Sequence, residues 1–287
     1  MAKTVSLVSP NFSDLLVPNF EIGKFPDGDS HIRIPQLSSC RDNNIIIYHR
    51  LYPDQNSSLV ELLLILDAVK QQGAKSVSAV VPYLPYSRQD KQKLAGEIMA
   101  ARGLCHALKA GGLDKLISFD CHFLNKTGIQ EFEGLTFENY SCGEELVEKA
   151  LEIFNGEEFE IIGPDEGSRY LVEGYGGKSL KKVRKEYVGS KLTYRDVHEV
   201  DGEFNVSGKN VLILDDMISS GSTMVKCLEK VAAAGAKNIA CGTTHGLFLF
   251  DCADRMRVFT RNIFATDTIL SPLAKVSIKN KIEKLNI

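Results

Sequence analysis

Short apolar segments alternate with longer amphipathic segments along most of the chain, and this alternation constrains the fold more than any other feature. Residues 43–50 contain three consecutive isoleucines with little alternation of polar and apolar positions, which predicts a strand buried on both faces. Residues 57–73 predict a helix, and residues 75–83 predict a second strand. Strands that alternate with helices in this way predict an α/β fold with a parallel sheet.

The same scheme continues through the rest of the chain. Further helices are expected over residues 96–112, 142–154 and 222–236, and further strands over residues 115–120, 159–165, 209–216 and 237–245. Because the scheme occurs in both halves, we expect two domains, residues 1–142 and residues 143–287. Each domain is expected to be a mostly parallel sheet flanked by helices.

The helix expected over residues 57–73 carries signals at both ends. Ser58 and Glu61 have the spacing of a capping box, in which two side chains bond backbone N–H groups at the start of a helix. Gly73 suits the other end, where glycine commonly stops a helix. We therefore expect the helix to begin beside Ser58.

The composition limits the partners and the compartment. Lys and Arg total 34 and Asp and Glu total 37, and the resulting net charge of −3 gives no electrostatic support for nucleic-acid binding. No apolar run approaches the roughly 18 residues of a membrane span, so no membrane partner is expected. The first residues lack the apolar region of a signal peptide. Seven cysteines without a CxxC pair predict reduced, mostly buried thiols in a cytoplasmic protein.

The sequence VLILDDMISSGSTM, residues 211–224, joins two carboxylates to a run of hydroxyl and glycine residues. In an open α/β sheet, ligands bind beyond the carboxyl ends of the strands, where the start of the next helix can hold a phosphate. The predicted phosphate-binding residues are Ser219, Ser220, Gly221, Ser222 and Thr223. Asp215 and Asp216 repel a phosphate, so they suit neutral hydroxyl groups beside it. A sugar phosphate satisfies both requirements, and a helix-capping turn with solvated acids is the alternative.

Five motifs, in order and at compatible spacing, resemble those of the ribose-phosphate diphosphokinase family, the synthetases of phosphoribosyl pyrophosphate (PRPP). They are FPDGDSHIRI at 25–34, PYLPYSRQDK at 82–91, DCH at 120–122, GPDEG at 163–167 and VLILDDMISSGSTM at 211–224. The resemblance implies two phosphoribosyltransferase-like domains, with ATP-binding motifs in the first and the ribose-5-phosphate and catalytic loops in the second. It also implies that Asp215 and Asp216 bind the ribose hydroxyls and that the following loop binds the 5-phosphate.

The resemblance assigns the ATP site to residues of the first half. It implies that Phe25, Asp27 and Asp29 bind the adenine and that they belong to a neighbouring subunit. From the residues alone, the sequence Pro-Asp-Gly predicts a tight turn. Arg88 and Gln89 follow two prolines, so we expect them on a rigid turn rather than in a helix. The resemblance makes both residues ATP-binding, whereas a surface salt bridge is the alternative for Arg88.

The resemblance further implies a magnesium site. His122 would bind ATP and, together with Asp165, a Mg²⁺ ion whose remaining ligands are water and phosphate oxygens. From the residue type alone, the alternative is a histidine at a strand end that is hydrogen-bonded within the protein and binds no ligand.

A catalytic pair is implied within a basic segment. Lys182 and Arg184 resemble the Lys-x-Arg pair of the family, and they lie in residues 174–202, which we expect to form a mobile loop over the site. The neighbouring Lys181 and Lys185 leave the register of this pair open. A solvated basic face is the alternative.

The implied reaction transfers the β,γ-diphosphoryl group of ATP to the 1-hydroxyl of ribose 5-phosphate, giving PRPP and AMP. A homo-oligomer with ATP sites shared between subunits is implied as well. The alternatives are a phosphoribosyltransferase that consumes PRPP and a non-catalytic regulatory homologue of the synthetase. The adenine-binding segment argues against the first alternative, and the presence of Lys182, Arg184, Asp215 and Asp216 argues against the second.

Overall fold

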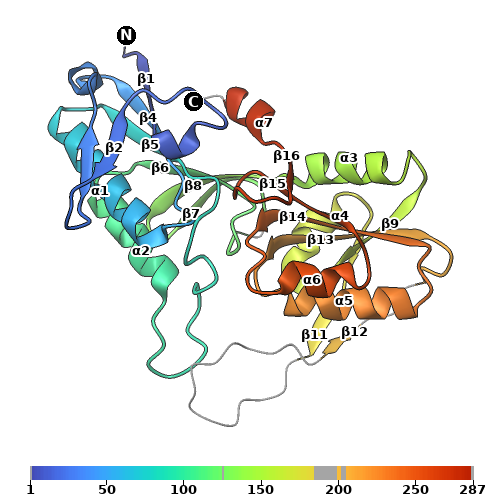
Figure 1. Cartoon of the computed structure of the whole chain (residues 1–287). Coiled ribbons are helices and arrows are strands. Elements are labelled where there is room, and N and C mark those ends of the chain that lie inside the picture. The colour runs from blue at the N-terminus through green and yellow to red at the C-terminus, as the bar shows by residue number, and fades with distance from the viewer. Residues whose placement is uncertain (1, 125, 184–198, 202–204, 286–287) are drawn as a thin grey trace. The chain divides into compact units, whose positions relative to one another are not determined.

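The computed structural model describes residues 2–124, 126–183, 199–201 and 205–285, with the backbone alone for 181–183 and 199–201. The chain forms two compact units (Figure 1). The first consists of Met1–Tyr140 together with Ile278–Ile287, and the second of Ser141–Ser277. The sequence-based division places the C-terminal segment in the second domain, whereas in the structure this segment groups with the first unit.

The first unit is built on a six-stranded sheet with the strand order β1-β4-β5-β6-β8-β7. The strands are β1 (Thr4–Val8), β4 (Asn44–Tyr48), β5 (Ser76–Val80), β6 (Lys115–Phe119), β8 (Leu135–Tyr140) and β7 (Gly128–Phe132). Adjacent strands are parallel, except that β7 pairs antiparallel with β8. Helices α1 (Gln55–Gln71) and α2 (Ala100–Ala110) contribute to the same hydrophobic core as these strands.

A separate antiparallel hairpin belongs to the first unit. It is formed by β2 (Glu21–Lys24) and β3 (Ser30–Arg33), and Ile22 and Ile32 pack against the core of the unit. The unit also contains the short helices η1 (Pro10–Phe12), η2 (Leu37–Cys40) and α7 (Lys279–Glu283).

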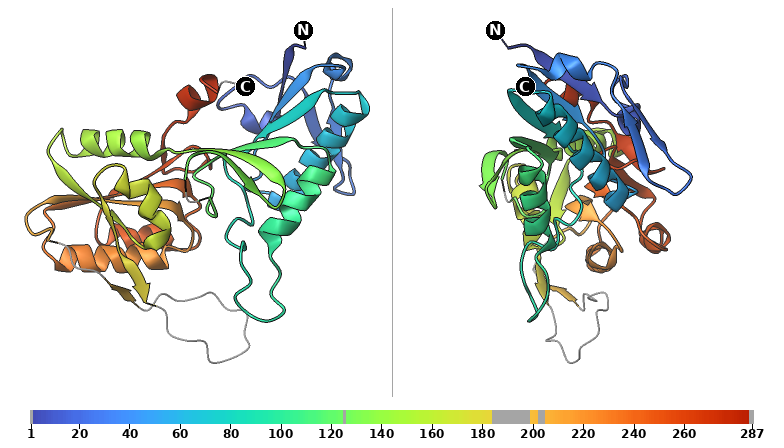
Figure 2. Two further views of the ribbon diagram at one scale, coloured as in Figure 1. Left: turned by 180° about the vertical axis from the view of Figure 1, so that it is seen from behind. Right: turned by 90° about the vertical axis from the view of Figure 1, so that its left-hand side faces the viewer.

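The second unit is built on another six-stranded sheet, with the strand order β10-β9-β13-β14-β15-β16 and all adjacent pairs parallel. The strands are β10 (Lys178–Ser179), β9 (Phe159–Gly163), β13 (Asn210–Ile218), β14 (Asn238–Gly246), β15 (Asn262–Thr266) and β16 (Ala274–Val276). Helices α3 (Gly143–Ile153) and α5 (Ser222–Ala233) lie on opposite faces of this sheet, as the views in Figures 1 and 2 agree. The remaining elements are η3 (Glu166–Ser168), α4 (Arg169–Glu173), α6 (Cys252–Arg257) and a ribbon of β11 (Lys181–Val183) and β12 (Glu199–Asp201).

The predicted α/β class with mostly parallel sheets is confirmed, but two local predictions are wrong. Helix α1 begins at Gln55 with Asp54 as its N-cap, so Ser58 and Glu61 form no capping box and lie instead on the buried face of the helix. Residues three apart lie on one face anywhere in a helix, which is why this spacing is ambiguous. Helix α2 begins at Ala100 rather than at residue 96, because Gly96 has a φ of +82°, outside the helical region.

The structure bears on two further expectations, the state of the cysteines and the absence of a membrane-spanning helix. All seven cysteines are buried and free, in agreement with the expectation of buried thiols. Among the described residues, no helix is long and apolar enough to span a bilayer.

Candidate active site

Asp215 and Asp216 lie inside β13, which continues to Ile218, two residues past its expected end at residue 216. The two residues are only 8% and 4% exposed. Strand β9 accompanies β13 only as far as Ile213, whereas β14 continues beside β13 up to the pair Ile218 and Gly246. The two acids therefore lie at the carboxyl edge of the sheet, past the end of β9, where open α/β sheets bind their ligands.

Asp165 reaches the same edge from the end of β9. Its Oδ1 accepts a hydrogen bond of 2.8 Å from the N–H of Gly167, which caps η3, and η3 packs beside β13. Burial of Cys227 raises the pKa of its thiol, and the negative charges of Asp215 and Asp165 raise it further. The predicted metal ligand and a predicted ribose-binding acid thus lie in one neighbourhood of the second unit.

The carboxylates at this edge are the kind of donor that hard divalent cations prefer. Within the residues that the structure describes, no group of three or more histidine, cysteine, aspartate or glutamate side chains is placed to hold a metal ion. A metal ion here would therefore need water or substrate oxygens among its ligands, which is how Mg²⁺ is commonly bound beside phosphates.

Gly221 forms the turn between β13 and α5 and is the N-cap of that helix. Its φ is +75°, in the left-handed region, and a Cβ atom at this position would overlap with the Sγ of Cys252. Both observations favour glycine here. The first N–H groups of any α-helix have no partner within the helix, so the start of α5, beside Ser222 and Thr223, can hold an anion.

The backbone of the preceding serines is held by contacts that the sequence did not reveal. The carbonyl oxygen of Ser219 accepts a hydrogen bond of 3.0 Å from the N–H of Leu249. Arg255 on α6 donates from Nη2 to the carbonyl oxygen of Ser220 and from Nε to Asp251, the latter at 3.0 Å. Only the spacing of Asp251 and Arg255 along a helix is visible in the sequence.

The predicted catalytic pair is only partly within the described residues. Lys182 lies on β11, opposite Val200 of the antiparallel partner β12. Arg184 lies outside the described residues, as do residues 184–198 of the segment expected to form a mobile loop. The catalytic roles of Lys182 and Arg184 stay predictions.

Arg88 and Gln89 lie in an exposed turn after β5, as predicted from the two prolines. The N–H of Gln89 donates to the carbonyl oxygen of Tyr86 at 2.9 Å, and Tyr86 has a φ of +63°. His122 lies half-buried in a turn after β6. Because β5 and β6 are neighbouring parallel strands, the two turns lie at the same edge of the first sheet.

Phe25 lies in the turn of the β2–β3 hairpin and is half exposed, with 50% of its surface accessible. Its N–H donates to the carbonyl oxygen of Asp29 at 2.8 Å, its own carbonyl oxygen accepts from Gly28 at 2.9 Å, and Oδ1 of Asp27 accepts from the N–H of Asp29 at 3.1 Å. The centroids of the Phe25 and His31 rings lie 4.9 Å apart. The predicted turn is therefore confirmed, and it presents an aromatic ring with two exposed carboxylates.

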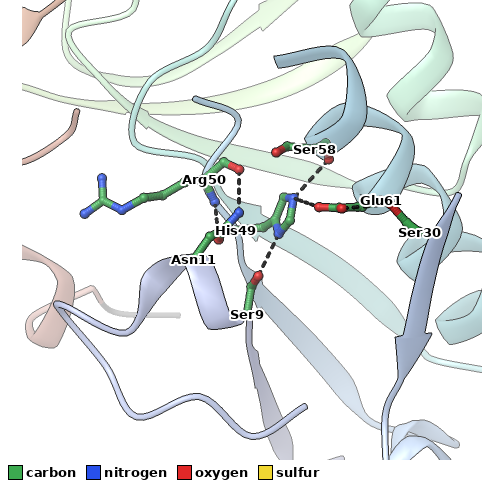
Figure 3. A network of polar contacts seen from close by, with 7 residues as sticks. All are labelled: Ser9, Asn11, Ser30, His49, Arg50, Ser58 and Glu61. Atoms are coloured by element: carbon green, nitrogen blue, oxygen red, sulfur yellow. Dashed lines mark hydrogen bonds and ion pairs between the residues drawn. The ribbon is translucent and has the colours of Figure 1, made fainter. Parts of the chain in front are cut away.

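A buried polar network at the end of β4 was not predicted (Figure 3). His49 is fully buried; its Nε2 lies 2.9 Å from the carbonyl oxygen of Ser58 and its Nδ1 3.0 Å from Oγ of Ser9. A carbonyl oxygen only accepts, so Nε2 carries the proton and Nδ1 accepts from the serine. Burial lowers the pKa of His49 to about 4, which leaves the ring neutral at pH 7. Oε2 of Glu61 lies 3.8 Å from Nε2, and Oε1 accepts a hydrogen bond of 2.8 Å from Ser30.

A parallel sheet that places two buried acids before a glycine-capped helix is typical of phosphoribosyltransferase domains, and residues 142–255 match the family model of that domain. Residues 8–112 match the N-terminal domain of ribose phosphate pyrophosphokinase. The chain is 35% identical over 260 residues to the ribose-phosphate pyrophosphokinase of Methanopyrus kandleri, covering 90% of this chain and 86% of that protein. It is 33% identical over 272 residues to the enzyme of the same name from Pyrococcus abyssi, covering 93% and 90%.

The chain therefore belongs to the ribose-phosphate pyrophosphokinase family. The crystal structure of phosphoribosylpyrophosphate synthetase from Mycobacterium smegmatis shares the fold, with a TM-score of 0.75, 22% identity and coverage of 98% of this chain and 96% of that one. Membership of the family implies that the reaction requires a divalent metal ion.

Proposed function

We propose that the protein transfers the β,γ-diphosphoryl group of ATP to the 1-hydroxyl of ribose 5-phosphate. The hydroxyl oxygen attacks the β-phosphorus, the bond from that phosphorus to the α,β-bridging oxygen breaks, and AMP leaves with the bridging oxygen. PRPP forms, and the hydroxyl proton is released. The observation that carries the proposal is the junction of two buried acids, Asp215 and Asp216, with the Gly221-capped start of α5, in a chain of this family.

Ribose 5-phosphate would bind at the carboxyl edge of the second sheet. Asp215 and Asp216 would accept hydrogen bonds from the ribose hydroxyls, which are neutral and tolerate the nearby carboxylates. The 5-phosphate would lie against the hydroxyl and N–H groups of Ser219, Ser220, Gly221, Ser222 and Thr223. The positive end of the α5 dipole supports an anion at this place.

ATP would bind to the first unit, Met1–Tyr140 with Ile278–Ile287, and the sugar phosphate would bind to the second unit, Ser141–Ser277. Arg88, Gln89 and His122 come from two turns at one edge of the first sheet and would contact the phosphates. Phe25 would stack on the adenine, and Asp27 and Asp29 would accept from its exocyclic amine.

Lys182 and Arg184 would stabilise the charge that develops on the transferred group. Phosphoryl-transfer enzymes gain most of their rate from positioning and from such cations, because the protein takes little part in the covalent chemistry. Lys182 lies on the short strand β11, and Arg184 follows this strand directly in the sequence.

Mg²⁺ is the proposed divalent ion, with Asp165 and His122 as its protein ligands. The position of Asp165 at the end of β9 supports the assignment, because the charges of Asp165 and Asp215 both act on Cys227 and make this edge of the sheet negative, which a cation would neutralise. When bound, the ion would offset the charge of the triphosphate oxygens.

We also propose a homo-oligomer that acts in the cytoplasm. A hairpin that presents a half-exposed Phe25 to solvent supports a site completed by a second copy of the chain. The seven buried, free cysteines support a reducing compartment.

The test of the reaction is product analysis. The purified protein is incubated with ATP, ribose 5-phosphate and MgCl₂, and nucleotides and sugar phosphates are separated by chromatography. We expect AMP and PRPP in equal amounts, and no AMP when ribose 5-phosphate is omitted. ADP as the product would contradict a diphosphoryl transfer. Absence of AMP together with base-dependent consumption of added PRPP would identify a phosphoribosyltransferase, and absence of both would identify a regulatory homologue.

The test of the shared ATP site is complementation. Phe25→Ala and Arg88→Ala proteins are each expected to lose activity at low ATP concentration. Dissociating and reassembling a mixture of the two should restore part of the activity, because some ATP sites would then contain both native residues, Phe25 from one kind of subunit and Arg88 from the other. No recovery in the mixture, although mixed oligomers form, would place both residues in one subunit's site.

A further inference from the structure

We infer that Ser30, Glu61 and His49 form a positioning network that fixes the β2–β3 hairpin on helix α1 and thereby sets the affinity for ATP (Figure 3). The inference rests on the proposed role of Phe25, Asp27 and Asp29 in reading the adenine. The three network residues act through that hairpin and do not touch the nucleotide themselves.

The contact between Ser30 and Glu61 joins two elements that are far apart in the sequence. Glu61 lies on the buried face of α1 and is only 6% exposed. Its Oε1 accepts a hydrogen bond of 2.8 Å from the hydroxyl of Ser30. Ser30 pairs with Lys24 in the hairpin, and this is the last pair before the turn. The hydrogen bond therefore fastens the hairpin to α1 directly at the start of the turn that carries Phe25.

Other contacts of the hairpin do not replace this attachment. Ile22 and Ile32 pack against the core, and they are paired with each other across the hairpin, farther from the turn than Ser30. Arg33 and Glu21 form an ion pair of 3.1 Å, but both side chains are exposed and the pair joins the two strands only to each other. Apolar packing thus holds the part of the hairpin that is distant from the turn, and the part-buried hydrogen bond between Ser30 and Glu61 holds the part next to the turn.

Both chain neighbours of Ser30 contact Phe25. The carbonyl oxygen of Asp29 accepts the N–H of Phe25 at 2.8 Å. The ring of His31 lies 4.9 Å from the Phe25 ring, with the two planes inclined at 51°. A displacement of Ser30 therefore moves both groups that orient Phe25.

His49 holds the turn of α1 from which Glu61 extends. Its protonated Nε2 donates to the carbonyl oxygen of Ser58, one helical turn before Glu61, and also faces Oε2 of Glu61 at 3.8 Å. On the other side of the ring, Ser9 donates to Nδ1. The imidazole thereby fixes the backbone of the turn of α1 from which Glu61 extends. The ring is neutral at pH 7 and makes no hydrogen bond with the Glu61 carboxylate, which only lies beside it.

The experiment separates ATP affinity from turnover. In the intact protein, Ser30→Ala is expected to raise KM for ATP by about fivefold to tenfold, because one hydrogen bond to a buried carboxylate is lost. The kcat and KM for ribose 5-phosphate should stay within about twofold. Ser30→Thr keeps the hydroxyl and should restore KM for ATP. Glu61→Gln keeps an acceptor oxygen and should resemble the unmodified protein, whereas Glu61→Ala should resemble Ser30→Ala.

Two further measurements serve as controls. Glu21→Ala removes an exposed polar contact within the same hairpin, and KM for ATP should not change. Hydrogen exchange followed by mass spectrometry should show faster exchange in residues 21–33 of Ser30→Ala than in the same residues of Glu21→Ala or of the unmodified protein. A role confined to general stability would change exchange throughout the first unit.

Phe25→Ala, measured in parallel, distinguishes the inference from the function on which it rests. If Phe25→Ala raises KM for ATP and Ser30→Ala does not, the positioning network is overturned while the adenine site stands. If Phe25→Ala leaves KM for ATP unchanged, the adenine site fails and the link from the network to ATP affinity fails with it. Equal changes in KM for both substrates in Ser30→Ala would also overturn the inference.

Discussion

Gly221 lies so close to Cys252 that a Cβ atom at position 221 would overlap with the Sγ of the cysteine. The contact joins the start of α5 to the start of α6, and it comes at a residue whose φ of +75° already favours glycine. We predict that Gly221→Ala raises KM for ribose 5-phosphate by about tenfold or more, because the turn must shift where the 5-phosphate would bind. KM for ATP should stay within about twofold.

Gly156→Ala is the matched control for this prediction. Gly156 has a φ of +79°, and a Cβ atom there would meet nothing within 4 Å. Gly156→Ala therefore has the energetic cost of placing alanine in a left-handed backbone conformation, but no overlap of its Cβ atom with another residue. Steady-state kinetics and thermal unfolding of both variants separate the two effects. An equal effect of the two changes on KM for ribose 5-phosphate would argue against a phosphate site at Gly221.

Asp216→Ala is expected to raise KM for ribose 5-phosphate by about tenfold to a hundredfold and to leave KM for ATP within about twofold. Asp216 is 4% exposed, and the loss of one charge-assisted hydrogen bond to a ribose hydroxyl costs about 1.5–3 kcal/mol. Asp216→Asn, which keeps one acceptor oxygen, should have a smaller effect. The measurement is steady-state kinetics with each substrate varied in turn. Equal changes for both substrates would be incompatible with the assignment.

Lys182→Ala is expected to lower kcat by roughly a hundredfold or more, because it removes a cation that acts on the transition state. Binding of ribose 5-phosphate, measured by calorimetry, should hardly change, since the proposed contacts of that substrate lie on residues 215–223. Lys181→Ala and Lys185→Ala test the register in the same assay. A large loss of kcat in either of these variants, with normal turnover in Lys182→Ala, would move the catalytic position.

The buried His49 should make stability fall in the weakly acidic range. Burial lowers its pKa from 6.5 to about 4, so between these values the unfolded chain holds a proton that the native protein does not. The contribution of the neutral His49 to the free energy of unfolding is fully present above pH 6.5. About 3 kcal/mol of this free energy is lost as the pH falls to 4. Urea unfolding across this range measures the effect. His49→Gln should show a shallower dependence, and an equally steep one would contradict the prediction.

The cysteines should be inert in the native protein. Burial raises the pKa of Cys105 to about 12 and that of Cys252 to about 11, and only the thiolate form of a cysteine reacts with alkylating reagents. Mass spectrometry after brief iodoacetamide treatment at neutral pH should show little labelling of the native protein. The same treatment in urea should label all seven cysteines. Rapid native labelling of any cysteine would contradict its burial.

The sequence predicts the sheets well because their strands are continuous apolar runs. The run Ile45–Ile47, for example, is buried on both faces, as its composition indicates. Ends of elements are less predictable, because the pairing partner decides them. Strand β13 extends through Met217 and Ile218 because β14 continues beside it, and the sequence of β13 does not contain that information.

The polar residues of the core could not be predicted for a related reason. Glu61 has a polar side chain at a position that faces the core, and its hydrogen-bond partner Ser30, which belongs to another element, accounts for it. Arg255 similarly gains its role from Ser220 of another element. The assignments to Lys182, Arg184 and the other proposed site residues rest on motifs and stay predictions until they are measured.

The segment that begins at Ile278 makes the first unit discontinuous in the sequence. Ile278 and Ile282 are buried and group with Met1–Tyr140, although the whole of Ser141–Ser277 intervenes. The second unit is therefore, in its topology, an insertion into the first. During synthesis on the ribosome, the second unit has been made in full before these last apolar side chains of the first unit exist. The first unit can therefore complete its packing only after that point, although most of its own sequence is synthesised first.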